Sequence, residues 1–309
     1  MAIDARLKSL FVMPAAVLSL LVFVVAVVML AFAAGYRLEW LGTALAAAPM
    51  PLLIGQLKLK PIARTSEFLP LHLLLTAVGL VLSMQGMYDN FTTSWELYND
   101  IGGALTSALY PGMQNLPGLL GLLAALLFLL YVFWYSRFGR FNDARLDVGG
   151  QLPEFELDDI DGNTVRSADL LGKPAVILFY RGNWCPLCMA QLDELVERYD
   201  EINRLGIQVC LVSPQPAEET RKLAERLGVS FRFLEDKGNA LAKALNIEVA
   251  NGVPLGISGN YASDTVLPTL IVTSAGGTIV FSDQTDNYRV RPEPDIFLAI
   301  LRRAGAVSG

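Results

Sequence analysis

The sequence is poor in residues that ligate soft metals, because its 309 residues include three cysteines and one histidine. A structural zinc site takes about four ligands, mostly cysteine and histidine. The single histidine, His72, lies in an apolar segment far along the chain from the cysteines. The composition therefore argues against a zinc site, and we expect neither a metal nor another cofactor.

Basic residues are outnumbered by acidic ones in the second half of the chain. Residues 142–309 contain 16 lysines and arginines against 24 aspartates and glutamates, whereas residues 1–141 contain 8 against 6. Contacts to nucleic-acid phosphates require lysine and arginine, so a domain of this charge is a poor nucleic-acid binder. We expect no nucleic-acid partner, and the change in composition predicts a domain boundary near residue 141.

Charge is absent from several long apolar segments of the first half. Residues 11–34, 68–87 and 116–135 are uncharged over about 20 residues or more, which is enough to cross a bilayer. Residues 41–57 form a weaker candidate that Pro49 and Pro51 interrupt, although proline is tolerated inside membrane helices. The sequence thus predicts a helical membrane domain over residues 1–141, with four spans in contact with membrane lipid.

The distribution of basic residues predicts the orientation of these spans. With four spans and both termini in the cytoplasm, eight basic residues lie inside: Arg6, Lys8, Lys58, Lys60, Arg64, Arg137, Arg140 and Arg145. Only Arg37 lies outside, since residues 88–115 contain no lysine or arginine. By the positive-inside rule this predicts a multi-pass protein of the bacterial inner membrane with residues 142–309 in the cytoplasm. The weak second span leaves an extracytoplasmic placement open.

A pair of cysteines at C-x-x-C spacing is the main chemical feature of the second half. The string Trp184-Cys185-Pro186-Leu187-Cys188 follows an apolar, strand-like run over residues 175–180 and precedes an amphipathic helix. Such a pair can close a disulfide, and a helix N-terminus stabilises a thiolate. We interpret it as a redox-active pair, with a static disulfide or two inert thiols as alternatives. Cys210 lies in an apolar, strand-like run and is interpreted as a buried structural thiol.

The elements expected around this pair alternate between strands and helices. Strands are predicted near residues 155–157, 164–165, 175–180, 207–212, 231–234, 267–272 and 278–281. Helices are predicted after Cys188 as far as Gly206, before Gly228, over residues 239–245 and over residues 294–303. This order predicts an α/β sheet with helices on both faces.

Residues 148–304 resemble the thioredoxin-like superfamily, and within it the peroxiredoxin-like branch of the AhpC/TSA (alkyl hydroperoxide reductase/thiol-specific antioxidant) family. The resemblance is carried by Pro153-Glu154-Phe155 with Asp161-Gly162-Asn163, the stretch from Tyr180 to Cys188, Ser213-Pro214-Gln215, Leu267-Pro268-Thr269 and the stretch from Tyr288 to Pro292. It implies a thioredoxin-like fold for residues 142–309 and antioxidant thiol chemistry. It also implies a cis bond before Pro268 that places Pro268 and Thr269 against the cysteines. No family resemblance extends to residues 1–141.

The sequence departs from the peroxiredoxin pattern at the reacting positions. A typical peroxiredoxin has Pro-x-x-x-Thr-x-x-Cys, which places its reactive cysteine at Cys188 and leaves Cys185 and Arg181 where it has threonine and proline. The arginine that usually helps to bind peroxide falls near Leu267. Thioredoxins instead react through the first cysteine.

The spacing itself favours Cys185 as the nucleophile at the helix start, with Cys188 resolving the intermediate. Trp184 and Pro186 flank this nucleophile as supporting residues. Arg181 or Arg291 could supply positive charge, although such arginines are more often solvated or salt-bridged.

Three functions fit these residues. The first is a membrane-anchored, peroxiredoxin-like oxidoreductase that reduces hydroperoxides and is restored by a thioredoxin- or glutathione-like thiol donor. The second is a thiol–disulfide oxidoreductase that acts on protein disulfides. The third is a non-enzymatic redox sensor that acts on the helical half.

Overall fold

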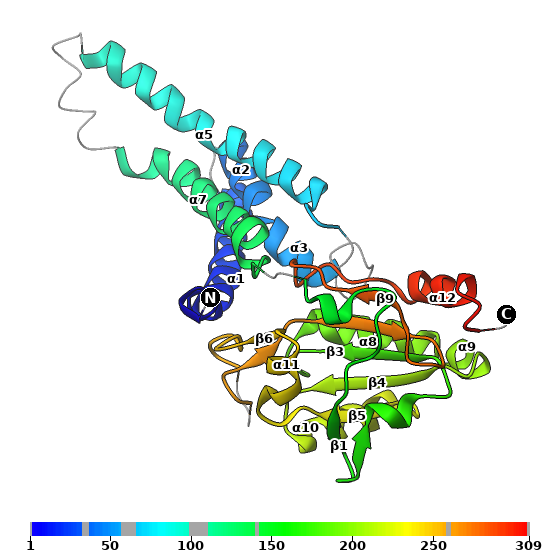
Figure 1. The fold of residues 1–309 in the computed structure, drawn as a ribbon. Coiled ribbons are helices and arrows are strands. Elements are labelled where there is room, and N and C mark those ends of the chain that lie inside the picture. Colours follow the sequence, from blue (N-terminus) through cyan, green and yellow to red (C-terminus); the bar gives the residue numbers. More distant parts are fainter. Residues whose placement is uncertain are drawn as a thin grey trace. The chain divides into compact units, whose positions relative to one another are not determined.

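The computed structural model describes residues 2–32, 37–56, 66–98, 111–139, 142–257 and 261–307. The chain forms two compact units (Figure 1). The helical unit comprises Phe11–Ile62 and Phe68–Tyr135. The sheet unit comprises Met1–Leu10, Ala63–Glu67 and Ser136–Gly309, so that three separate stretches of the chain contribute to it.

The helical unit is built from apolar helices of very different lengths. Its elements are α1 (Ala2–Phe32, whose first residues belong to the sheet unit), α2 (Arg37–Ala47), α3 (Pro49–Gln56), α5 (Pro70–Tyr98), α7 (Pro111–Leu130) and the π-helix η1 (Tyr131–Tyr135). Helices α2 and α5 approach closely at two glycines, where a Cβ on Gly42 would lie 2.7 Å from the carbonyl oxygen of Gly79. Residues without a bulky side chain allow two helix backbones to approach this closely.

The described helices include two or three candidate spans, so the prediction of four spans is not confirmed. Asp4–Phe32 and Asn115–Tyr135 are long and apolar enough to cross a membrane. Helices α2 and α3 are bent by 44° at their junction and could form a third span together. The bend follows from Pro49, which has no N–H to continue the hydrogen bonds of α2. The apolar part of α5, Pro70–Gln85, is shorter than these candidates.

Helix α5 also differs from the sequence prediction at its C-terminal end. A loop was expected from residue 88, but the helix continues to Tyr98. The stretch has no proline after Pro70, so nothing in its backbone chemistry forces an end at residue 88. The loop was predicted over residues 88–115; residues 99–110 lie outside the described residues, and residues 111–115 belong to the start of α7.

The sheet unit contains a seven-stranded mixed sheet of order β2-β1-β5-β4-β3-β8-β9. The strands are β1 (Glu156–Asp159), β2 (Thr164–Arg166), β3 (Ala175–Phe179), β4 (Gln208–Ser213), β5 (Arg232–Glu235), β8 (Thr269–Thr273) and β9 (Ile279–Asp283). Strands β3, β4 and β5 are parallel, while β1 and β8 pair antiparallel with β5 and β3. A separate antiparallel pair is formed by β6 (Glu248–Val249) and β7 (Thr265–Val266).

Helices connect these strands as the alternating pattern predicts. They are α8 (Pro186–Glu197), α9 (Tyr199–Arg204), α10 (Ala217–Leu227), α11 (Ala240–Ala244) and α12 (Pro294–Arg303), with short 3-10 turns at Ala144–Leu146, Ser167–Leu170 and Lys237–Asn239. The helix predicted as far as Gly206 is interrupted at Arg198, which divides it into α8 and α9. The β6–β7 pair was also not predicted, since it brackets a stretch that reads as a loop. The described sheet unit otherwise has the strands and helices expected from the sequence, including α12 at its predicted bounds.

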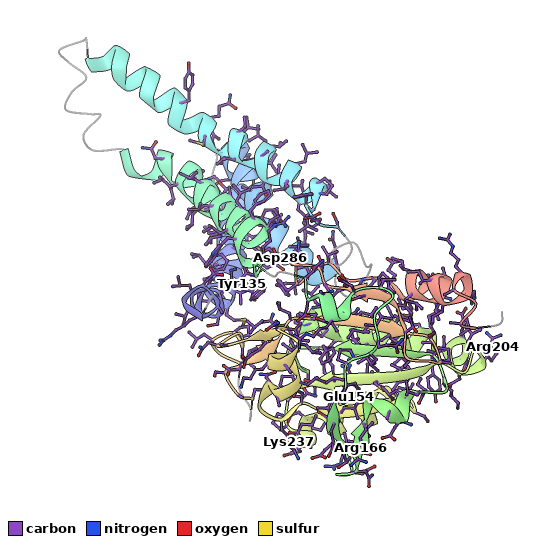
Figure 2. All side chains as sticks on the ribbon, viewed as in Figure 1. Tyr135, Glu154, Arg166, Arg204, Lys237 and Asp286 are labelled. Atoms are coloured by element: carbon purple, nitrogen blue, oxygen red, sulfur yellow. The ribbon has the colours of Figure 1, made fainter. Side chains whose placement is uncertain are left out.

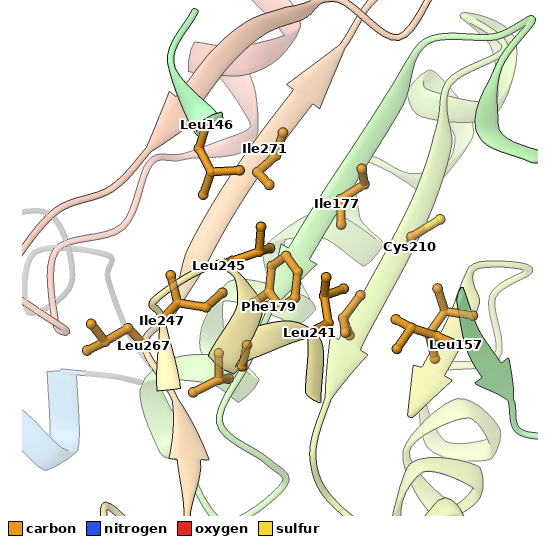
Figure 3. Packing of buried hydrophobic residues seen from close by; sticks show 14 of the residues in the cluster. Leu146, Leu157, Ile177, Phe179, Cys210, Leu241, Leu245, Ile247, Leu267 and Ile271 are labelled. Carbon is orange, nitrogen blue, oxygen red and sulfur yellow. The ribbon is translucent and has the colours of Figure 1, made fainter. Parts of the chain in front are cut away.

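The core is centred on β3, whose five residues are all buried. Such a continuous apolar run is typical of a central strand covered on both faces. On one face, Ile177 and Phe179 pack with Cys210 of β4 and with Leu241 and Leu245 around α11 (Figure 3). This packing fixes the end of β3, from which the chain turns toward the cysteines.

In contrast to the apolar core, the edge of the sheet formed by β2 and β1 carries charged side chains. Arg166 of β2 pairs with Glu156 at 3.0 Å, and Lys237 pairs with Asp158 at 2.7 Å. Figure 2 shows both cationic side chains at this margin of the unit. Charged side chains on an edge strand disfavour pairing with another chain.

Truncation of the central strand should destabilise the sheet unit. We expect Ile177→Ala to lower the free energy of unfolding by about 2–5 kcal/mol, because it leaves a cavity in a packed core. Thermal unfolding of the full chain in detergent would measure this. Ile296→Ala on the exposed face of α12 is the matched control, and an equal loss in both variants would contradict the assigned core.

Candidate active site

Both cysteines lie where β3 leads into α8. Cys185 is the N-cap of α8, and its sulfur accepts a hydrogen bond from the backbone N–H of Cys188 at 3.4 Å. Pro186 occupies the first helical turn, where its fixed φ suits the helix and its missing N–H costs nothing. The local sequence thus places both sulfurs at the positive end of a helix.

The two sulfurs form a buried, closely spaced pair. Cys185 is 2% exposed and Cys188 is 1% exposed. Both are free thiols, and their sulfur atoms lie 2.9 Å apart, so that one thiol can donate a hydrogen bond to the other. The two cysteines predicted to act as a dithiol pair thus lie close enough to react with each other. The burial of both sulfurs restricts which reactants can reach them.

Positive charge is directed at the second sulfur. The backbone N–H of Arg181 donates to Cys188 Sγ at 3.5 Å, and Arg291 Nη2 lies 3.9 Å from the same sulfur. Arg291 is held by hydrogen bonds to the Tyr288 carbonyl at 2.7 Å and to Gln191 Oε1 at 3.1 Å. Arg291 is 3% exposed, so it is a buried site residue and not a solvated surface arginine.

This arrangement separates the acidities of the two thiols. Burial raises the pKa of Cys188, but hydrogen bonding from Cys185 and the nearby Arg291 and Arg181 outweigh it and lower that pKa to about 6. Burial, with the hydrogen bond to Cys188, raises the pKa of Cys185 well above its usual range. A thiolate is the reactive form of cysteine, and the surroundings favour it at Cys188.

Arg181 lies beneath the site in a group of three aromatic rings. Its guanidinium carbon is 4.7 Å from the ring centre of Trp184, 5.3 Å from that of Tyr288 and 5.9 Å from that of Phe138. Its Nη2 also donates to the Gly252 carbonyl at 2.5 Å. Cation–π contacts stabilise a desolvated arginine. Two of the supporting residues predicted from the sequence, Arg181 and Trp184, are thus brought together.

A buried amide network shapes the loop before Cys185. Gln215 is 2% exposed; its Nε2 donates to Tyr180 Oη at 3.0 Å, and its Oε1 accepts from the Asn183 backbone at 2.8 Å. Gly182 has a φ of 140°, and a Cβ there would lie 2.8 Å from Trp184 Nε1. The loop conformation therefore requires glycine.

Two residues of the site, Gln215 and Gln191, received no role in the sequence analysis. Gln215 belongs to Ser213-Pro214-Gln215, one of the motifs that carry the family resemblance. Its place in that motif could have indicated a role in the site. Gln191 has no such signal, because one glutamine on a helix is indistinguishable from a surface residue until its partner is known. Its partner Arg291 lies 100 residues further along the chain.

The predicted cis bond before Pro268 is wrong, since the peptide bonds of the described residues are all trans. The Leu267 N–H pairs with the Ile247 carbonyl, and the chain then enters β8 directly, so a trans proline is accommodated at the strand start. Thr269 pairs with Phe179 at the end of β3, which places it beside the turn that leads to the cysteines. Its hydroxyl donates to the Leu267 carbonyl at 3.0 Å.

Cys210 belongs to the core and not to this site. It is fully buried on β4 and pairs with Ile177 of β3. Burial raises its pKa to about 12, so its thiol is unreactive at neutral pH. Within the described ranges, no group of three or more histidine, cysteine, aspartate or glutamate side chains could hold a metal ion.

A dithiol at a strand-to-helix turn of a mixed sheet defines a thiol-dependent redoxin domain. The sequence profile of the AhpC/TSA family matches residues 148–282, and the chain belongs to this family. It is similar to the thiol-disulfide oxidoreductase ResA of Halalkalibacterium halodurans, with 30% identity over 148 residues, which are 47% of this chain and 73% of that protein.

The chain is also similar to the chloroplastic peroxiredoxin Q of Populus jackii, with 29% identity over 32% of this chain and 47% of that protein. The matched region thus spans about half the length of several such relatives. Among solved structures, peroxidoxin BcpB of Mycobacterium tuberculosis has 20% identity, covers 51% of this chain and 97% of its own, and has a TM-score of 0.42. Relatives by sequence therefore include both peroxiredoxins and thiol–disulfide oxidoreductases.

Removal of the Arg291 charge should make Cys188 less acidic. We expect Arg291→Met to raise the pKa of Cys188 by about one unit or more, because an opposite charge near a thiolate favours the ionised form. At about pH 6 this lowers the thiolate fraction about fivefold. The pH dependence of iodoacetamide alkylation at Cys188, followed by mass spectrometry, measures it. The exposed Arg303→Met is the control, and an unchanged profile in Arg291→Met would contradict the electrostatic assignment.

Proposed function

We propose that the protein is a membrane-anchored thiol peroxidase that cycles Cys185 and Cys188 between dithiol and disulfide. The observation that carries this proposal is the convergence of Arg291 and the Arg181 N–H on a buried Cys188 sulfur. Peroxide attack requires a thiolate and nearby positive charge for the alkoxide or hydroxide that leaves. In the peroxiredoxin pattern the peroxide-binding arginine falls near Leu267. In this chain Arg291 supplies the charge from a different place in the sequence.

The cycle balances with a hydroperoxide as the oxidant. The Cys188 thiolate attacks the terminal oxygen, the O–O bond breaks, and the departing alkoxide takes a proton to become an alcohol. The resulting sulfenic acid reacts with the Cys185 thiol, which forms the disulfide and releases water. Two thiols of an external donor, of the thioredoxin or glutathione type, then reduce the disulfide.

This order of events assigns the two cysteines differently from the spacing argument. The spacing favoured Cys185 as nucleophile, whereas the charges favour Cys188, which is also the position of the reactive cysteine in the peroxiredoxin pattern. Cys185 remains 2.9 Å away and is placed to resolve the intermediate. The identity of the attacking cysteine therefore distinguishes a peroxidase from a thioredoxin-like enzyme.

Exchange with protein disulfides is the second candidate function. It is supported by the C-x-x-C spacing and by the similarity to a protein named thiol-disulfide oxidoreductase. In-line attack on a protein disulfide requires an accessible sulfur, but both sulfurs are at most 2% exposed. A small hydroperoxide meets this restriction more easily than a protein, and we therefore favour the peroxidase.

Stoichiometric oxidation of the full chain tests the proposal. With micromolar hydroperoxide we expect thiol loss in well under a second, because the reacting cysteine is already ionised at neutral pH. Cys188→Ser should abolish this phase. Cys185→Ser should retain it but stop at a sulfenic acid that dimedone traps. Stopped-flow kinetics and mass spectrometry provide the readouts.

Cys210→Ala is the matched control and should behave like the unmodified chain. Two results would overturn the peroxidase. One is oxidation no faster than that of a free thiol, together with rapid exchange against a protein disulfide. The other is loss of the fast phase in Cys185→Ser alone, which would assign the attack to Cys185.

We further propose that the apolar helices anchor the protein in the bacterial inner membrane with the sheet unit in the cytoplasm. Support comes from the two span-length helices and from the basic residues of the flanking segments. A C-terminal green fluorescent protein fusion should then fluoresce, and a C-terminal alkaline phosphatase fusion should be inactive. A phosphatase fusion within residues 99–110 should be active. The reverse pattern would place the sheet unit outside the cytoplasm.

A further inference from the structure

We propose that Arg289 is a positioning residue for the dithiol site. It ties the segment Tyr288–Arg291 to the two chain segments that precede α5 and follow η1, and so holds the Arg291 guanidinium at Cys188. The inference rests on the proposed function in taking Cys188 as the reacting thiolate.

Arg289 is buried and fully engaged. It is 1% exposed and is one of the largest fully buried side chains described. Its Nε donates to Ser136 Oγ at 3.0 Å, its Nη1 to the Ser66 carbonyl at 3.1 Å and its Nη2 to the Glu67 carbonyl at 2.8 Å. The planar fork of an arginine can bind several acceptors in one fixed orientation, which a lysine cannot do.

The residues before Arg289 are bound to the same segments. The Tyr288 N–H donates to the Ser136 carbonyl at 3.0 Å, and Asn287 forms an isolated β-bridge with Arg137. Asp286, labelled in Figure 2, accepts from the Phe138 N–H at 2.9 Å. The backbone from residue 286 to residue 289 is therefore held along its length by the chain that follows η1.

The start of the chain joins the same group of contacts. Lys8 is 3% exposed; its ammonium group bonds the Arg137 carbonyl, pairs with Asp4 at 2.6 Å and lies 4.9 Å from the ring centre of Phe138. Arg137 in turn pairs with Glu67 at 2.6 Å. The start of α1, the segment before α5 and the segment after η1 thus meet around Arg137, which forms the bridge to Asn287.

Only one residue separates Arg289 from Arg291. The Val290 N–H donates to the Asn287 carbonyl at 3.0 Å, and Arg291 Nε donates to the Tyr288 carbonyl at 2.7 Å. The Arg291 side chain is therefore anchored on the backbone that Arg289 immobilises. Because Arg291 Nη2 lies 3.9 Å from the sulfur, a small shift of this segment changes the field at Cys188.

The charged and titratable groups around Cys188 are few enough to isolate this effect. They are Cys185 on the same turn, Arg181 and Tyr180 from the end of β3, and Arg291. The hydrogen bonds described for Arg289 run to Ser136, Ser66 and Glu67, and Arg289→Lys keeps the charge at this position. Such a change reaches Cys188 through the neighbours of Arg289, which are Arg291 and, by way of the Tyr288 ring, Arg181. A double variant separates these two routes.

Site-resolved alkylation of the full chain in detergent tests the proposal. We expect Arg289→Lys, which keeps the charge but loses the fork, to shift the pH profile of Cys188 alkylation upward. The rate at about pH 6 should fall about threefold or more, with little change at high pH where the thiol is ionised in both proteins. Ser136→Ala, which removes one acceptor, should cause a smaller shift in the same direction.

The decisive comparison uses Arg291→Met as background. If Arg289 acts through Arg291, Arg289→Lys should cause no further shift there, since coupled residues are not additive. Ser167→Ala, another buried serine whose hydroxyl bonds a backbone group, is the matched control and should leave the profile unchanged.

Equal shifts in both backgrounds, or an unchanged profile in Arg289→Lys and Ser136→Ala, would overturn the inference. Loss of folding in Arg289→Lys would leave Ser136→Ala to decide. Hydroperoxide turnover is measured separately, so a failed peroxidase assay with an intact alkylation shift would reject the proposed function and not the positioning role.

Discussion

The site depends on one sulfur, that of Cys188, which is removed from water. Hydrogen-bond donors and positive charge around this sulfur replace its lost hydration. A thiolate removed from water is costly unless hydrogen bonds and opposite charge replace its hydration. At Cys188 these are a backbone N–H, a guanidinium group and the thiol of Cys185. Each comes from a part of the fold whose position is fixed for another reason: the end of a buried central strand, an anchored segment far along the chain, and a helix N-cap.

The surrounding fold explains how these donors are held in place. Strand β3 is buried along its length and pairs with neighbours on both sides, so its last residue cannot move without disturbing the core. The loop that follows is held by the Gln215 amide and by the conformation that only Gly182 adopts easily. On the other side, Arg291 is fixed by Gln191 from α8 itself. The helix that carries the sulfur thus also orients the charge that acts on it.

Much of the sheet unit could be predicted from the sequence, because its signals are local. The buried run of β3, the C-x-x-C turn and α12 follow from residues close together in the chain. The parts that were not predicted depend on residues far apart in the sequence or on weak signals for the ends and bends of helices. Arg291 was named as one of two candidate sources of charge, but the sequence could not show that it lies at Cys188, 103 residues away, or that Gln191 holds it there. In the helical unit, the bend at Pro49 and the short apolar part of α5, Pro70–Gln85, left the four-span prediction unconfirmed.

Because Cys185 is the N-cap of α8, the oxidation step and the reduction step of the proposed cycle make different demands on this helix. In the dithiol form its sulfur accepts the Cys188 N–H and closes the first turn of α8. The disulfide of the proposed cycle would form within this same turn, since both cysteines belong to it. A small oxidant needs no opening of this turn, whereas a protein that reduces the disulfide must reach a sulfur in it. Local opening of the first turn of α8 would then set the rate of reduction, and the stability of a few helical residues would govern how long the oxidised form lasts.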